Sequence, residues 1–462
     1  MAAPLQIVER TSTLPVSAEE AFAWHERPGA FERLTPPWEH VTVLERAGGI
    51  RDGARTVIML RVGPARFRWV AVHRDFVPGR RFTDEQVEGP FSRWIHEHRF
   101  EPAGSTAVRY TDRIEFGAPH GTVGAQAGRR LARPRVKRML AYRHATLRDD
   151  LAAHARYRDR ARLKVAVTGA TGLIGSALVP FLTTGGHEVT IVTRRRGLPG
   201  SIHWDPAAGV IDHAGLEGMD AVVHLAGENI GFRWSEHRKR RIRESRVEGT
   251  MFLAEALASL KRPPRVLVSA SAVGIYGNRG DEVLAEDAPD LTPTDFLVEL
   301  GHDWESANDP ARAAGIRVVN PRFGLVLTPA GGALGAMLPA FRLGVGGPLG
   351  RGRQWVSWIS VDDAIGALHH ALFHDELAGP VNTAAEPVTS RTFAATLGRV
   401  LRRPAVLPAP APALKLLFGE MADKGLLASQ RLSPARLMSS GYAFRHPTLE
   451  SALRHVLGRA EG

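Results

Sequence analysis

The sequence predicts an α/β protein whose larger, C-terminal part is a doubly wound parallel sheet and whose N-terminal part is an α+β domain. An apolar run, a glycine turn, a helical segment and a second apolar run follow one another between residues 163 and 194. Alternation of apolar and polar residues with period two dominates residues 41 to 116, which is typical of antiparallel strands. The 462 residues exceed one ordinary core and favour two to four domains.

Residues 163 to 194 predict a β-α-β unit that binds a dinucleotide. Leu163–Val167 is a buried-type strand, a helix continues from Ser176, and a second strand covers Glu188–Thr193. Between strand and helix the glycines are spaced G-x-x-G-x-x-G. This spacing suits a tight turn, close approach of backbone N–H groups to a pyrophosphate, and close packing of helix on strand. A β-α turn without ligand is the alternative.

The residues after the second strand indicate which cofactor binds. An NAD site usually has an acidic residue there for the ribose 2′-hydroxyl, whereas this chain has Arg194-Arg195-Arg196. Guanidinium groups suit a 2′-phosphate, so we expect NADP (NADPH) rather than NAD, with a solvated turn as the alternative. The expected cofactor contacts from this unit are Gly169, Thr171, Gly172, Leu173, Ile174, Gly175 and Arg194.

Composition excludes several classes of protein. Apolar residues make up 44% and charged residues 23% of the chain, as in globular proteins, and no apolar run reaches the ~20 residues of a membrane span. The absence of cysteine excludes disulfides, thiolate metal sites and cysteine nucleophiles, and it fits a reducing compartment. We therefore predict a cytoplasmic protein and no metal site.

The net charge of +12 raises the question of an anionic partner. Its densest cluster lies near the end of the N-terminal region, and on a helix these charges would be spread around the cylinder. We interpret the cluster as a solvated helix face rather than a surface for phosphate or anionic lipid, and we find no nucleic-acid-binding motif. The cluster comprises Arg129, Arg130, Arg133, Arg135, Lys137, Arg138, Arg143 and Arg148.

Residues 1–157 predict one domain with a strand, two short helices, a run of strands and a long helix. Ser17 and Glu20 have the spacing of a helix-capping box. The strands expected after the helices are 41–44, 55–62, 67–76, 80–87, 92–101 and 106–116, separated by Gly and Pro turn pairs, and the long helix covers about 124–154.

This order resembles the helix-grip fold of the START-like or polyketide-cyclase-like superfamily, and the phrase PVSAEEAFAW at 15–24 is similar to that family's first helix. The resemblance implies an apolar cavity for a lipid-like or polycyclic ligand between the sheet and the long helix. His96 and His98 alternate with apolar neighbours, and we interpret them as ordinary sheet residues. The aromatic residues that would line the cavity, or pack the core, are Trp69, Phe76, Phe82, Trp94, Phe100 and Phe116.

Further motifs follow in the larger part: GMDAVVHLAG at 218–227, SAVGIYG at 271–277, NPRFG at 320–324 and GGPLGRGRQW at 346–355. With the glycine turn, they resemble the atypical, sugar-epimerase-like branch of the short-chain dehydrogenases. The resemblance implies a Rossmann-type domain at 158–412 and a small C-terminal domain of unknown function at 413–462. It also implies cofactor contacts from the segment after the third strand, namely Leu225, Ala226, Gly227 and Asn229.

The same resemblance implies a Ser, Tyr-x-x-x-Lys catalytic group. Ser271 matches the serine, but Phe296 and Leu300 stand where the tyrosine and lysine are expected. Tyr276 is then the expected proton donor, with His302, Asp303 or Glu305 as alternatives. Loss of catalysis is the remaining alternative, in which the domain binds NADP as a sensor or scaffold.

Substrate contacts are expected from the second half of the fold, where a glycine-rich loop carries guanidinium and aromatic groups. A purely structural loop around the cofactor is the alternative. We therefore predict an NADP-dependent oxidoreductase or epimerase-like enzyme with an attached domain for an apolar ligand. The expected substrate contacts are Arg322, Arg353, Gln354, Trp355 and Trp358.

Overall fold

The computed structural model describes residues 5–117, 125–289 and 295–459, and the side chains of 125–131 lie outside the described set. The chain folds into two compact units. Unit 1 consists mainly of residues 1–160, and unit 2 consists mainly of residues 161–456. Each unit contains a large sheet of its own.

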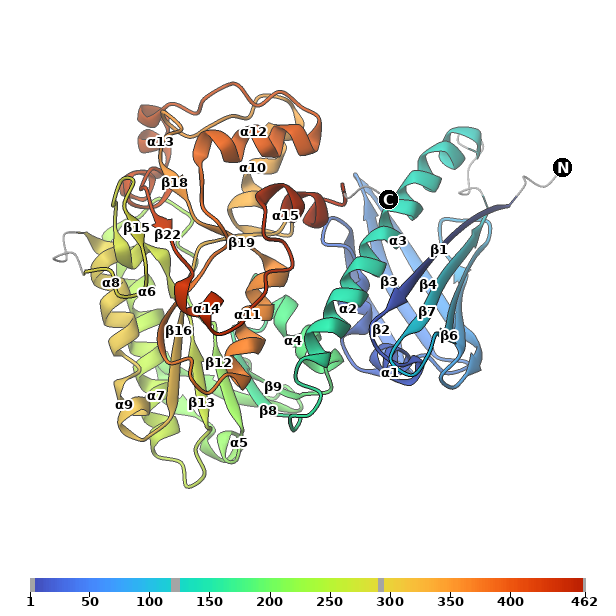
Figure 1. The fold of residues 1–462 in the computed structure, drawn as a ribbon, viewed down its shortest axis with the longest axis horizontal. Coiled ribbons are helices and arrows are strands. Elements are labelled where there is room, and N and C mark those ends of the chain that lie inside the picture. Colours follow the sequence, from blue (N-terminus) through green and yellow to red (C-terminus); the bar gives the residue numbers. More distant parts are fainter. Residues whose placement is uncertain (1–4, 118–124, 290–294, 460–462) are drawn as a thin grey trace. The chain divides into compact units, whose positions relative to one another are not determined.

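Unit 1 is a seven-stranded antiparallel sheet that curves around a long helix (Figure 1). The sheet order is β1-β7-β6-β5-β4-β3-β2, and β1 pairs with β7 along its whole length. This architecture confirms the predicted helix-grip domain. The elements are β1 (Gln6–Leu14), α1 (Ala18–Glu26), α2 (Ala30–Leu34), β2 (His40–Ala47), β3 (Arg55–Val62), β4 (Ala65–Val77), β5 (Arg81–Glu88), β6 (Trp94–Pro102), β7 (Val108–Phe116) and α3 (Ala125–Ala155).

Helix α1 begins where the sequence places its cap. The backbone N–H of Glu20 donates to Ser17 Oγ at 3.3 Å, which satisfies one of the N–H groups that a helix start leaves unpaired. In a capping box the Glu20 carboxylate would accept from the backbone N–H of Ser17. Here it accepts instead from the Arg27 guanidinium at 2.8 and 3.1 Å. The Glu20 side chain therefore pairs with the residue that follows the C-terminal end of the helix.

The interior of unit 1 contains two apolar clusters. Phe82 and Phe100 pack with Phe22 and Leu147 in one cluster, and Trp94 and Phe116 pack with Leu140 in the other. Most of the aromatic residues expected around a ligand cavity are therefore core residues. Phe76 and Phe100 line a cavity of about 760 Å³ beside α1, whose rim carries arginines 51, 80, 81 and 99.

Unit 2 is a doubly wound, mostly parallel sheet, as predicted. Its order is β11-β10-β9-β8-β12-β13-β16-β14, with β20 also paired to β16. The chain builds outward from β8 in one direction through β9 and β10, and then returns to the other side through β12. The order therefore reverses between β8 and β12, and in such sheets ligands bind outside the carboxyl ends of the strands at this reversal.

The elements of the sheet and its helices, in chain order, are β8 (Lys164–Thr168), α4 (Gly175–Thr184), β9 (Glu188–Thr193), β10 (Ser201–Asp205), β11 (Val210–Ile211), α5 (His213–Leu216), β12 (Ala221–His224), α6 (Glu236–Arg243), the π-helical turn η2 (Glu244–Glu248), α7 (Gly249–Ala258), β13 (Val266–Ser269), β14 (Ser271–Ala272), α8 (Phe296–Ser306), α9 (Asp309–Ala313), β16 (Arg317–Phe323), α11 (Val361–Phe373) and β20 (Gly379–Thr383).

The C-terminal segment packs within unit 2 rather than apart from it. β22 (Arg431–Leu432) pairs with β15 (Val283–Leu284), and Met421 joins an apolar cluster with Trp234 and Leu300. The remaining elements are β17 (Leu325–Leu327), α10 (Gly332–Arg342), β18 (Trp355–Val356), β19 (Trp358–Ser360), β21 (Val388–Thr389), α12 (Ser390–Leu401), α13 (Ala411–Phe418), α14 (Ala435–Ser439) and α15 (Leu449–Val456). Among the described residues, no helix has the length and apolar composition that crossing a membrane requires.

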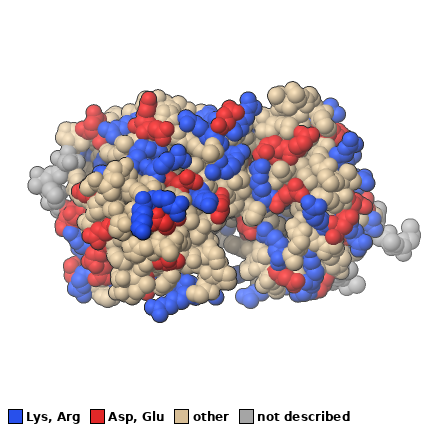
Figure 2. Space-filling view, turned by 90° about the horizontal axis from the view of Figure 1, so that it is seen from below, with Lys and Arg blue, Asp and Glu red and all other residues tan. Residues whose placement is uncertain are grey.

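The basic residues expected on one solvated helix face differ in their exposure and in their ion-pair partners. Arg135 pairs with Glu39 and Arg148 with Asp149, whereas Arg143 points inward to Asp112, 3.6 Å away. The side chains of Arg129 and Arg130 lie outside the described residues. On the face drawn in Figure 2, basic and acidic side chains are interspersed. The charge cluster is thus partly a solvated surface and partly an interior ion pair.

Candidate functional site

The glycine turn lies at the carboxyl end of β8, at the reversal of the strand order. Gly169 has φ +66°, and a Cβ there would lie 2.6 Å from the backbone carbon of Leu225. A Cβ on Gly175 would collide with the carbonyl oxygen of Gly169, and one on Gly172 would lie 3.1 Å from the same oxygen. Gly169 and Gly175 therefore permit an approach of backbone to backbone that a side chain would block, and Gly172 lies where a side chain would be crowded. α4 begins at Gly175, so the positive end of its helix dipole lies at this turn.

A hydrogen-bonded network fixes the turn against the next strand. Thr168 Oγ1 accepts from the backbone N–H groups of Leu225 and Ala226 at 3.1 and 3.2 Å. It also lies 2.7 Å from His224 Nδ1, and His224 Nε2 lies 3.0 Å from Thr250 Oγ1. With both lone pairs used, the Thr168 hydroxyl donates its proton to Nδ1. The network therefore assigns the neutral Nε2–H tautomer to His224.

The pKa of His224 agrees with this tautomer. The side chain is fully buried, and burial lowers its pKa to about 4. Because the groups that its nitrogens contact are hydroxyls rather than carboxylates, nothing in contact with the ring stabilises a positive charge. His224 is thus a neutral bridge that joins β8, β12 and α7 beneath the turn.

Arg194 directly follows β9 and is exposed. Because β8 and β9 are parallel and Thr168 pairs with Val192, Arg194 lies at the same edge of the sheet as Gly169. Among the other expected contacts, Leu173 packs its side chain on Gly331 and Gly332, while Thr171 is exposed. The turn residues and Arg194 therefore lie at the same edge of the sheet, at the carboxyl ends of two neighbouring strands.

The segment after β12 is held by a partly buried arginine. Arg246 Nη1 donates to the carbonyl of Glu228 at 2.9 Å, and its guanidinium carbon lies 4.9 Å from the ring centre of Trp304. Burial lowers the pKa of Arg246 to about 10, so the side chain remains a cation at neutral pH. A Cβ on Gly227 would lie 3.2 Å from this guanidinium carbon. The expected contacts Ala226, Gly227 and Asn229 thus lie in a segment that contacts the cationic Arg246 side chain.

Ser271 does not face a tyrosine–lysine pair. Its Oγ donates to Glu305 Oε1 at 2.6 Å, and Arg322 grips the same carboxylate through Nε and Nη2, both at 2.8 Å. The exposed side-chain fractions of Arg322 and Glu305 are 8% and 13%. Burial lowers the pKa of Arg322, but the Glu305 carboxylate outweighs burial and holds that pKa above its usual value. The arrangement therefore brings Ser271 to a carboxyl group that is paired with a guanidinium.

Tyr276 belongs to the same network. It donates to Asn382 Oδ1 and accepts from Arg322 Nη1, each at 2.8 Å. Its ring is buried, and burial raises the pKa of Tyr276 above its usual value although Arg322 acts in the opposite direction. Both the donor and an acceptor position of the hydroxyl are thus engaged within the protein. Of the alternatives considered from sequence, Glu305 is the one that contacts Ser271, while Asp303 pairs with Arg243.

The positions that usually carry tyrosine and lysine are apolar in structure as well as in sequence. Leu300 is 4% exposed and packs with Trp234, Ile242 and Leu297, and Phe296 packs at the edge of this cluster. The ring of Phe296 lies 5.3 Å from that of Trp234. These two residues therefore stabilise the fold and carry no proton-transfer group.

The residues expected to contact substrate have different surroundings. Arg353 is exposed, Gln354 donates to the carbonyl of Leu349, and Trp355 donates to Asp281 at 2.8 Å. Trp358 is fully buried in β19, and its Nε1 has no hydrogen-bond partner among the described residues. Arg322, as shown above, holds Glu305. Trp358 is thus a buried residue, whereas Arg353 lies at the surface.

Sequence reasoning missed two residues of this region. His224 was part of the strand motif, but its bridging role depends on Thr250, 26 positions away. Arg246 lies in the basic segment at 233–246, where nothing local distinguishes it from its exposed neighbours. The π-helical turn η2 that carries Arg246 is a departure from regular helix of the kind often found at functional sites.

Comparison with known proteins agrees with this geometry. Residues 165–383 match the NAD dependent epimerase/dehydratase family, residues 14–140 match the polyketide cyclase / dehydrase and lipid transport family, and residues 409–456 match a domain of unknown function. Fold and site define unit 2 as an NAD(P)-binding Rossmann domain of the epimerase type. An epimerase family protein of Mycobacterium bovis is 44% identical over 298 residues, which are 64% of this chain and 98% of the relative. The chain belongs to this epimerase family.

Solved structures extend the likeness to the whole chain. A nucleoside-diphosphate sugar epimerase from Corynebacterium glutamicum has a TM-score of 0.80 and 34% identity, covering 98% of this chain and 90% of that one. Human epimerase family protein SDR39U1, solved with NADPH, has a TM-score of 0.58 and 38% identity, covering 64% of this chain and 99% of that one. The first of these spans both units, and the second spans about as much of the chain as unit 2.

Proposed function

We propose that the chain is an NADP-dependent oxidoreductase or epimerase-like enzyme that acts on a small-molecule substrate in unit 2. The observation that supports this most directly is that the glycine turn lies at the reversal of the strand order and that Arg194 follows the neighbouring strand β9 at the same edge of the sheet. The turn suits a pyrophosphate, and the guanidinium suits a 2′-phosphate. The NADPH in the human relative's structure agrees with this preference.

The protein groups that would carry the chemistry are Ser271 and Glu305. NADP supplies hydride transfer at its nicotinamide. Ser271 lies at the carboxyl end of the sheet next to β13, where its oxygen would accept the proton of a substrate hydroxyl as its own proton passes to Glu305. Glu305, held in place by Arg322, would accept the proton that Ser271 relays. Tyr276 would then position Arg322 rather than donate the proton itself.

The cofactor is tested by titration with NADPH and NADH, followed by nicotinamide fluorescence. Arg194→Ala should weaken NADPH binding by about 10- to 100-fold, because a charged hydrogen bond contributes about 1.5–3 kcal/mol, and should leave NADH unchanged. The matched control is Arg196→Ala, an exposed neighbour two residues further along. Equal losses for both nucleotides, or for both variants, would reject the assignment of Arg194.

The catalytic assignment is tested with Glu305→Gln, which keeps the shape of the side chain and removes its charge. Nucleoside-diphosphate sugars are the first substrates to screen, because a relative that spans this chain is described as a nucleoside-diphosphate sugar epimerase. Turnover should fall by about 10²- to 10⁴-fold while NADPH affinity stays the same. The control is Glu299→Gln on the same helix, whose carboxylate pairs with Arg243. Unchanged turnover in Glu305→Gln would exclude the proposed proton acceptor.

A second candidate function is an NADP-binding sensor without turnover, and the apolar packing of Phe296 and Leu300 favours it. Tight NADPH binding with no turnover of any substrate, in the wild type and in Glu305→Gln alike, would establish this function.

For unit 1 we propose an apolar or lipid-like ligand, supported by the family match at 14–140 and the cavity beside α1. A cytoplasmic location is proposed from the absence of cysteine.

A further inference from the structure

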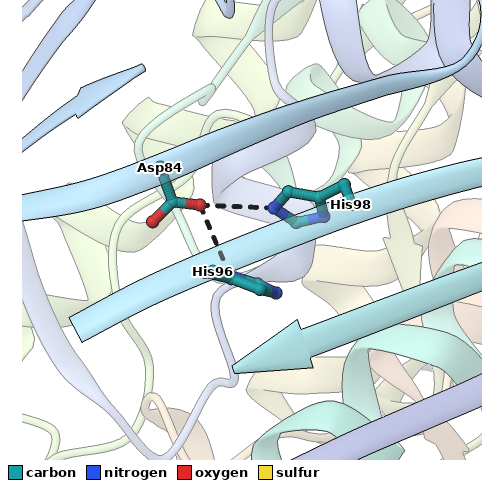
Figure 3. Close-up of side chains that lie close together, drawn as sticks. All are labelled: Asp84, His96 and His98. Carbon is teal, nitrogen blue, oxygen red and sulfur yellow. Dashed lines mark hydrogen bonds and ion pairs between the residues drawn. The ribbon is translucent and has the colours of Figure 1, made fainter. Parts of the chain in front are cut away.

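Unit 1 contains a histidine–aspartate cluster (Asp84, His96, His98 and Asp112) on three adjacent strands. His96 and His98 are two residues apart on β6, so both face the interior. The register places Asp84 opposite His96 and Asp112 opposite His98. His96, His98 and Asp112 are 5%, 2% and 0% exposed, and Figure 3 shows Asp84 facing the two rings. The cluster is therefore a polar site inside the domain.

Three donor atoms of the cluster converge on one point. Asp84 Oδ2 lies 3.2 Å from His98 Nε2 and 3.4 Å from His96 Nδ1, and the three atoms lie within 4.8 Å of one another. Zn²⁺ with four ligands at about 2.0–2.2 Å separates neighbouring ligand atoms by about 3.3–3.6 Å. The two distances from Asp84 Oδ2 thus suit neighbouring ligand positions of a tetrahedral ion, and the two nitrogens lie within 4.8 Å of each other.

The other nitrogen of each ring faces Asp112. Its Oδ1 lies 2.6 Å from His98 Nδ1 and 3.2 Å from His96 Nε2. Each ring thus lies between two carboxylates, and an ionised carboxylate only accepts hydrogen bonds. Binding of a cation at this point would displace the protons from the two nitrogens that face Asp84, because a histidine ligand must be deprotonated at the metal-binding nitrogen. Asp112 then accepts from the protonated nitrogens on the other side of the rings and orients them, as carboxylates commonly do behind metal-bound histidines.

Charge and access agree with a divalent cation. Two carboxylates lie in the cluster, and the permanent cation beside them is Arg143, whose Nε is 3.6 Å from Asp112 Oδ2. Buried carboxylates need paired charge or a metal. The Asp84 side chain is 21% exposed, so an ion can reach the site from solvent, whereas Asp112 is fully enclosed. We propose that Asp84, His96 and His98 bind one Zn²⁺ ion, with Asp112 as the orienting carboxylate and a fourth position open to water or a ligand oxygen.

A matched internal control exists in unit 2. Asp362, His446 and His455 form a second group whose possible ligand atoms lie within 4.8 Å of one another. Its residues have other contacts in the fold, including the stacked rings of His446 and His455 at 4.6 Å. His446→Asn therefore separates the contribution of this group from that of the histidine–aspartate cluster.

The test is Co²⁺ and Zn²⁺ titration of the full chain after dialysis against a chelator. In the His446→Asn background we expect one equivalent of Co²⁺, with the intense visible absorption of a four-coordinate ion, displaced by Zn²⁺. Adding Asp84→Asn or His98→Asn should abolish this absorption, and adding Asp112→Asn should weaken affinity by about 10- to 100-fold. Far-UV circular dichroism shows which variants remain folded.

The outcomes are decisive even where a variant fails to fold. X-ray absorption at the zinc edge of the folded His446→Asn protein should show two imidazoles and oxygen, and this measurement needs no change in the cluster itself. No stoichiometric binding in that protein would overturn the proposal. Binding that survives Asp84→Asn, or that is lost with His446→Asn alone, would also overturn it.

Discussion

His224 in unit 2 and His98 in unit 1 are both buried in the middle of a sheet, with exposed fractions of 0% and 2%, yet their partners differ in chemistry. His224 lies between two threonine hydroxyls, and His98 lies between two aspartates. Next to His98, burial lowers the pKa of His96, but Asp112 and Asp84 outweigh burial and raise that pKa above its usual value. Burial alone therefore does not decide what a histidine does; the atoms at its two nitrogens decide it.

The largest expected effect tests the carboxylate side of this comparison. Asp112→Asn replaces a fully buried acceptor that faces His96, His98, His144 and Tyr110. Breaking a buried charged pair by removing one partner costs about 3–5 kcal/mol, and we expect this loss in the free energy of unfolding of unit 1. Urea unfolding without added metal measures it. A loss below about 1 kcal/mol would mean that the aspartate does not organise the interior.

Acid should reveal the neutral histidine of unit 2. The folded pKa of His224 is about 4 and the unfolded value is 6.5, so between these values the unfolded chain binds more protons. The contribution of His224 to stability is complete above pH 6.5 and declines as pH falls, by roughly 3 kcal/mol at pH 4. Hydrogen exchange of β8 and β12, corrected for intrinsic rates, should show this decline in the wild type.

His224→Gln should flatten the decline in β8 and β12, because glutamine does not titrate. Arg194→Ala provides a control whose pH dependence should match that of the wild type. An equal decline in the His224→Gln protein would place the acid-sensitive group elsewhere.

A smaller effect is expected where a hydroxyl rather than a carboxylate is removed. Thr168→Val keeps the shape of the side chain but removes the acceptor for the N–H groups of Leu225 and Ala226. We expect a loss of about 1–3 kcal/mol, because buried donors are left unpaired, together with weaker NADPH binding at the adjacent turn. Thr190→Val on β9 is the matched control. Unchanged NADPH affinity in Thr168→Val would separate the network from the cofactor site.

The smallest effect is expected for a buried histidine that contacts no carboxylate. His25 donates to the carbonyl of Ala21 at 2.8 Å, and its Nε2 has no hydrogen-bond partner among the described residues. His25→Leu should change the free energy of unfolding at pH 7 by about 1 kcal/mol or less, since one modest hydrogen bond is lost and one unsatisfied atom is removed. A loss as large as that of Asp112→Asn would show that position in the core matters more than the partner.

Local pattern was sufficient for much of the fold because strands, turns and glycine spacing are encoded by neighbours in the chain. The strand expected at 55–62 is β3, and the expected β-α-β unit is β8, α4 and β9. The three glycines of the turn could be singled out from the sequence because they lie within six residues of one another and because the close contacts of Gly172 and Gly175 are to backbone near them in the chain. The Glu20 carboxylate shows the limit of such reasoning, since its partner Arg27 lies outside the local motif.

The amino-acid sequence by itself determined the two fold types, the glycine turn with Arg194 behind it, and the absence of the tyrosine–lysine pair. Only the tertiary structure decided that Glu305 accepts a hydrogen bond from Ser271, 34 positions away. It also decided that Asp84 and Asp112 lie on opposite sides of the His96 and His98 rings. The physical reason is that period-two alternation fixes which face of a strand a residue occupies but not which residue stands opposite it. That register is set by the closure of the whole sheet, and the hydrogen bonds of the cluster depend on it.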